Sequence, residues 1–178
     1  MSWNNWRSRA QDSRGPSDIE KLTQLFEQLG AKDPRQWASS QVNEGTPQLA
    51  RYLFLRQAWR LIMSDASDAW IAERIREYEA NPLQPLSGVG KSLQSLRNKN
   101  ATPDELTDLI RGVQVELLLQ LCYLLEDPGD IEEEVQDVAW GLFLLDGKGR
   151  PTTRVSGLHE SVLATDPLGT EMRPRNTE

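Results

Sequence analysis

Apolar residues recur every three or four positions through most of the first 126 residues, which is the spacing of one buried helix face. Proline near a first turn and glycine past a last turn mark several helix ends, because proline needs no helical N–H and glycine tolerates a left-handed stop. The pattern predicts a helix over about 18–29, a second after Asp33-Pro34 ending near Gly45, a third beginning with Thr46-Pro47, a fourth over about 68–80, and a short one carrying Val89, Leu93 and Leu96.

The segment Thr102 to Glu126 carries the strongest pattern in the chain. Thr102 and Glu105 form a capping box with Pro103 in the first turn, so a helix is expected to begin here. A helix that is apolar on nearly every side is normally buried. We therefore expect a central helix wrapped by the others, and a charge at Leu117 or Leu121 should unfold the protein. Its primary stripe consists of Leu106, Leu109, Ile110, Val113, Leu117, Leu121 and Leu124.

The helical spacing of apolar residues gives way to a different pattern after Asp127-Pro128-Gly129. Residues 131–138 are consistent with one more short helix, and 140–145 and 150–155 are predicted as strands on either side of a hairpin turn. A two-stranded hairpin is not stable alone, so it must pack on the helices.

The predicted fold class is therefore mainly α, a multi-helix bundle around a buried central helix over about 102–126, with a small C-terminal β-hairpin or irregular appendage. The predicted domains are a polar tail over 1–16, a helical domain over 17–138, and an appendage over 139–178 that packs on the helical domain.

The composition is that of an acidic globular protein, with a formal net charge of -7 over 178 residues. Duplex-binding domains usually carry a basic face, so neither nucleic acid nor an anionic membrane is expected as a partner. The chain has a single cysteine, Cys122, in an apolar run, which excludes an intrachain disulfide and suits a reducing compartment. The N-terminus lacks a secretory apolar run, and we expect a cytoplasmic protein of bacterial type.

Between Glu126 and Asp137 the chain has seven acidic residues and no basic one. Such a run is either a solvated face or a docking surface for a basic protein. The candidate partner-binding residues in it are Glu132, Glu133, Glu134 and Asp137. Trp3 and Trp6 are a second candidate, because tryptophan is enriched at binding hot spots, although both could also dock on the protein's own surface.

Carboxylates at helical spacing suggest an alternative chemistry. Glu105-x-x-Asp108 and Glu133-Glu134-x-x-Asp137 would each place acidic groups on one helix face, where they could hold Mg²⁺. The set resembles the EExxE and ExxD helices of all-α nucleotide pyrophosphohydrolases, with the order reversed and aspartate as the third acidic residue. The resemblance implies a metal-dependent hydrolase over about ten residues.

Two shorter motifs lack their required context. Gly88-Val-Gly-Lys-Ser92 resembles the end of a phosphate-binding loop, but Pro85 stands where the first glycine should be and no strand precedes it. His159 is the only histidine, and neither Ser156 nor Ser161 lies in a nucleophile-elbow sequence.

The sequence thus favours a non-enzymatic cytoplasmic protein-binding module, an adaptor or an immunity-type inhibitor, that uses an acidic face. We expect its partner to be another protein, with a basic surface as the complement, and no cofactor, metal or catalytic residue is assigned. The metal-dependent all-α hydrolase is the alternative, and the pattern leaves the oligomeric state open.

Overall fold

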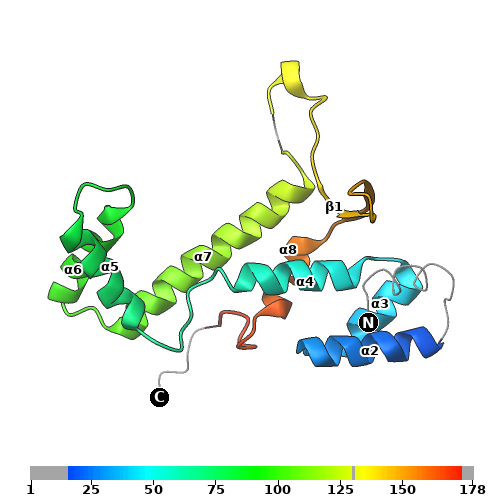
Figure 1. Cartoon of the computed structure of the whole chain (residues 1–178), viewed down its shortest axis with the longest axis horizontal. Helices are drawn as coiled ribbons and strands as arrows, with labels where there is room; N and C mark the ends of the chain where they lie inside the picture. The colour runs from blue at the N-terminus through cyan, green and yellow to red at the C-terminus, as the bar shows by residue number, and fades with distance from the viewer. Residues whose placement is uncertain (1–15, 130, 174–178) are drawn as a thin grey trace. The chain divides into compact units, whose positions relative to one another are not determined.

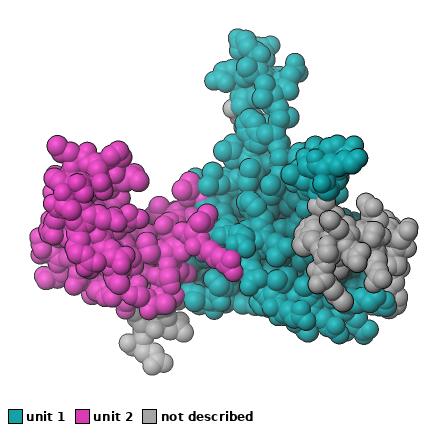
Figure 2. Space-filling model, in the orientation of Figure 1, with its two compact units in different colours: residues 1–59, 118–178 teal, residues 60–117 magenta. Residues whose placement is uncertain are grey.

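The computed structural model describes residues 16–129 and 131–173 (Figure 1). The described chain is mainly helical with one antiparallel two-stranded sheet near the C-terminus, which confirms the predicted fold class at that level. It divides into two compact units (Figure 2). One unit combines the described residues up to Trp59 with those from Leu118 onward, and the other spans Arg60–Leu117. Among the described residues, no helix is long and apolar enough to cross a bilayer.

Three successive helices build the first unit's main core. They are α2 (Pro16–Leu29), α3 (Pro34–Glu44) and α4 (Gln48–Trp59), and their bounds agree with the predicted pattern. Aromatic rings fill the space between them, with the Phe26 and Trp37 rings 5.9 Å apart and the Tyr52 ring edge-on to both. Gly45 ends α3 at φ +73°, as the glycine stop predicts.

The inward face of α4 includes a charged residue, since Arg51 is buried together with the fully buried Leu55. Leu61 follows the end of the helix and is 82 % exposed. The short C-terminal helices α8 (Leu158–Ser161) and η2 (Leu163–Thr165) pack on α4 and supply polar partners. These partners let α4 bury a charged side chain, which apolar spacing alone could not reveal.

The second unit is built around two antiparallel-paired helices and the beginning of a third. Helices α5 (Ala69–Ala80) and α6 (Ser87–Asn98) make extensive contacts, and α7 (Pro103–Glu126) adds its first turns. Ile71, Leu93 and Leu106 form the buried cluster. Gly90 lies where α6 touches α5, because a Cβ atom there would fall 2.1 Å from the Arg74 carbonyl oxygen.

Helix α7 begins as predicted but is not wrapped on all sides. The Thr102 hydroxyl accepts from the Glu105 N–H at 3.2 Å and the Glu105 carboxylate accepts from the Thr102 N–H at 2.7 Å, which confirms the capping box. The expectation of a central helix buried all round is wrong, since most of its primary stripe is about half exposed. The exposed members are Leu109, Val113, Leu117, Leu121 and Leu124.

The segment after α7 contains less regular structure than predicted. The helix expected over 131–138 is reduced to one 3-10 turn, η1 (Glu133–Val135). The hairpin is present, with β1 (Leu142–Leu145) antiparallel to β2 (Pro151–Val155) and Leu142 opposite Val155. The predicted appendage, residues 139–173 of the described chain, lies in the same compact unit as α2–α4.

Candidate protein-binding surface

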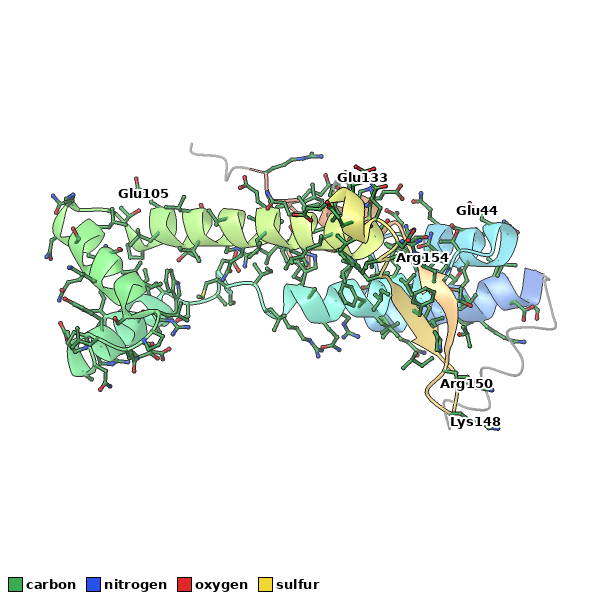
Figure 3. All side chains as sticks on the ribbon, turned by 90° about the horizontal axis from the view of Figure 1, so that it is seen from above. Glu44, Glu105, Glu133, Lys148, Arg150 and Arg154 are labelled. Carbon is green, nitrogen blue, oxygen red and sulfur yellow. The ribbon has the colours of Figure 1, made fainter. Side chains whose placement is uncertain are left out.

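The acidic residues singled out from the sequence lie on one exposed stretch. We name residues 127–129 and 131–139 the acidic excursion, because the chain leaves the end of α7, reaches away and turns back to β1 (Figure 1). Its carboxylates gather around η1, where Figure 3 labels Glu133. Val135 and Val138, 42 % and 53 % exposed, stand among them. The structure therefore presents apolar and acidic groups together. The exposed carboxylates are those of Glu132, Glu133, Glu134 and Asp137.

Both ends of the acidic excursion are fixed at the C-terminus of α7. The last carbonyl groups of a helix have no partner within the helix and carry partial negative charge. Here the Trp140 indole N–H donates to the Leu124 carbonyl, and the Arg154 guanidinium donates to the Glu126 carbonyl. These two hydrogen bonds give partners to carbonyl groups at the end of α7. They also hold the segment that returns toward β1 close to the point where the chain leaves α7.

Glu126, the first acidic residue of the run, is a structural group and not part of the exposed face. Its carboxylate accepts from the backbone N–H of Gly157 at 2.8 Å and of Leu158 at 2.5 Å. The His159 Nδ1 lies 3.2 Å from the same carboxylate, and the Tyr123 ring stacks on the imidazole at 3.9 Å. Burial raises the pKa of the Glu126 carboxyl, but these hydrogen bonds outweigh burial and leave the pKa below its ordinary value.

Arg51 supports the same loop. Its Nε donates to the Ser156 carbonyl at 2.9 Å, and its Nη1 donates to the Ser161 hydroxyl at 3.1 Å. Burial lowers the pKa of Arg51, although the nearby carboxylates of Glu160 and Glu126 oppose that shift. Ser161 is buried, and the Arg51 guanidinium that donates to its hydroxyl cannot act as a general base, because it has no free acceptor.

Sequence reasoning missed this network of Arg51 and Glu126. Arg51 contacts residues 105 and 110 positions away, Glu126 contacts residues 31 and 32 positions away, and no local spacing signals such pairs.

The carboxylates predicted as ligands of the alternative metal site either make other hydrogen bonds or do not share a helix face. Hydrogen bonds from the Thr102 backbone and hydroxyl lower the pKa of Glu105, which is committed to the capping box. Glu133 and Glu134 lie on a single 3-10 turn that ends before Asp137, so a shared helix face does not form there. Within 16–129 and 131–173, no three acidic, histidine or cysteine side chains gather in a way that could hold a metal.

The glycine-lysine motif lies inside a helix. Ser87 to Ser92 form the first turns of α6, and Gly90 is packed against α5. A phosphate-binding loop presents its backbone N–H groups outside a helix, and these residues lie within one.

Cys122 is expected to be unreactive. Its thiol is fully buried in the described structure, and burial together with the Glu126 charge raises its pKa to about 11. The nucleophile is the thiolate, so Ellman's reagent at neutral pH should leave the folded protein unmodified and label it fully in denaturant. Rapid labelling of the folded protein would contradict this placement.

Trp3 and Trp6 lie outside the described residues. The surface that the structure assembles is therefore the acidic excursion with its clamped ends. The chain matches no protein-family model, no curated protein and no solved structure.

Proposed function

We propose that this chain is a non-enzymatic protein-binding module whose acidic excursion recognises a basic surface on another protein. Within that class, a cytoplasmic adaptor or an immunity-type inhibitor, which would cover the basic active site of its target, fits best. The observation that carries the proposal is the group of four exposed carboxylates around Val135 and Val138, on a stretch held at both ends.

The chemistry of the acidic excursion supports this function. Protein interfaces combine an apolar centre with a polar rim, and complementary charge raises both association rate and specificity. Of the described residues, none forms an ion pair with Glu132, Glu133, Glu134 or Asp137. The clamps at Trp140 and Arg154 reduce the ordering cost of binding, since the loop ends are already fixed.

Charge reversal tests the proposal. We expect Glu132→Lys, Glu133→Lys and Glu134→Lys, combined, to leave folding intact and to weaken a specific interaction by about tenfold or more. The measurement is affinity capture from native lysate at low and high salt, followed by titration of the captured protein against the purified variants.

The control is a second triple reversal, Glu20→Lys, Glu27→Lys and Glu73→Lys, which changes the net charge equally at exposed positions outside the acidic excursion. A partner lost with the first variant and kept with the second supports the proposal. Equal loss in both would assign the effect to overall charge, and unchanged binding in both would remove the excursion from the interface.

A further inference from the structure

Trp140, at the base of the acidic excursion, exposes an aromatic ring whose polar group already has a partner. Its indole N–H donates to the Leu124 carbonyl, and the residue is nevertheless 41 % exposed. Amphipathic side chains usually keep the polar tip in water and bury the apolar body. Trp140 does the reverse, so the surface that it exposes is carbon and π-electron surface.

The Trp140 ring is also held in position. The hydrogen bond to Leu124 fixes the indole, and strand β1 begins two residues later at Leu142. Tryptophan is enriched at binding hot spots, and a side chain that is already ordered loses little conformational entropy when it binds. Trp140 therefore has the properties of an anchor residue in an interface.

The charges around Trp140 indicate what such an anchor would hold. Asp137 precedes Trp140 by three residues, and Asp127 follows its acceptor Leu124 by three. Three residues of chain span at most about 11 Å, so both acidic residues lie close to the hydrogen-bonded pair. Of the residues that the structure describes, none forms an ion pair with either aspartate. An exposed aromatic ring near two such carboxylates is suited to a cation.

The chain's own arginine at this end of α7 has a different partner. Arg154 donates to the Glu126 carbonyl. A Cβ atom at Gly141 would lie 3.1 Å from the Phe143 ring and 3.3 Å from the Arg154 Nε, so the guanidinium and the Phe143 ring both lie beside Gly141. Arg154 thus serves the end of the helix, and a cation for Asp127 and Asp137 has to come from a partner.

We propose that Trp140 anchors an arginine side chain of the partner protein, whose guanidinium stacks on the exposed indole and pairs with a carboxylate of the acidic excursion. This inference rests on the proposed function, because it names the group through which the basic partner would bind. Arginine suits the position better than lysine. Its planar guanidinium stacks on an aromatic ring and still presents donors at its edge, whereas the compact ammonium is more strongly hydrated.

Two matched peptides test this preference without the natural partner. One is a flexible peptide of glycine, serine and arginine, and the other has lysine in place of every arginine. Fluorescence anisotropy with the full chain should show the arginine peptide binding about threefold tighter or more. Equal affinity of the wild-type chain for the two peptides would overturn the proposal.

Two substitutions at position 140 separate stacking from the hydrogen bond. Trp140→Phe and Trp140→Leu both remove the N–H that is donated to Leu124, but only phenylalanine keeps an aromatic ring. We expect Trp140→Phe to retain most of the arginine preference and Trp140→Leu to abolish it, with both variants folded by circular dichroism. Equal loss in both would make Trp140 only a hydrogen-bond donor that holds the loop, and an unchanged preference in Trp140→Leu would place the arginine elsewhere. Either result would overturn the proposal.

Phe143→Leu is the positional control. It removes another aromatic ring of the same unit, 42 % exposed and already beside Arg154, and it should leave the arginine preference unchanged. A preference lost in Phe143→Leu as fully as in Trp140→Leu would contradict the assignment to Trp140.

The triple reversal at Glu132, Glu133 and Glu134 separates this inference from the proposed function. It should weaken binding of both peptides and leave the ratio of their affinities in favour of arginine. If the reversed chain binds both peptides as the wild type does, the proposed function fails and the arginine anchor fails with it. If the reversal weakens binding but the Trp140 variants behave alike, only the arginine anchor fails.

Discussion

Gly90→Ala should destabilise the unit of residues 60–117 by about 2–3 kcal/mol, the upper part of the range seen for overpacked contacts. The new methyl carbon would lie 2.1 Å from the Arg74 carbonyl oxygen and 2.6 Å from the Tyr78 Cβ, so α5 and α6 would have to separate. Alanine favours a helix over glycine by up to about 1 kcal/mol, which offsets only part of that cost. Urea denaturation followed by circular dichroism measures the difference.

Gly88→Ala is the matched control, because it makes the same change two residues earlier in α6. A Cβ atom at Gly88 meets nothing within 4 Å. We expect this variant to be as stable as the wild type or more stable by up to about 1 kcal/mol. If Gly90→Ala were equally neutral, the close packing of α5 against α6 would be wrong.

Helix ends were predictable from local chemistry. Thr102 and Glu105 lie three residues apart and bond each other's backbone, so the sequence alone marks where α7 begins. Gly45 stops α3 for an equally local reason, its positive φ. Such signals depend on neighbours within four residues, and these neighbours are visible in any sequence.

Burial was less predictable, and α7 shows why. Its composition indicates that much of its surface is apolar, but composition does not indicate what is available to cover it. Leu118 and Leu121 have the same side chain three positions apart, and the first is buried while the second is 47 % exposed. The difference depends on which segments pack on the helix, and hydrophobic spacing does not encode that choice.

The acidic composition of the candidate surface was predictable from the sequence, but the hydrogen bonds of Arg51 and Glu126 beside it were not. The exposed carboxylates around Glu133 follow from a run of acidic residues, because ionised groups remain in water unless they are paired. Arg51 and Glu126 are charged too, and their neighbours in the sequence do not indicate that either one is paired. Both are instead held by backbone groups of the loop 156–158, which lies far away in the sequence.

Glu126→Gln should destabilise the loop 156–159 and lower the free energy of unfolding by about 1–3 kcal/mol at neutral pH, since an amide offers one acceptor oxygen where the carboxylate offers two. One of the Gly157 and Leu158 N–H groups would then lack a partner. Glu116→Gln, an exposed change on the same helix, should stay within about 0.5 kcal/mol of wild type. Denaturation curves of the three proteins measure both effects, and equal stability of all three would contradict the role of Glu126.

The same carboxylate predicts how stability depends on pH. Because the pKa of Glu126 is lower in the folded chain than its ordinary value of 4.5, the unfolded chain takes up a proton first as the pH falls. The carboxylate's contribution is therefore complete above the ordinary pKa and is lost as the pH drops through the lower folded value. The stability difference between wild type and Glu126→Gln should be largest near neutral pH and shrink below about pH 4. A difference that stayed constant across this range would mean that the hydrogen bonds to Glu126 do not depend on its ionisation.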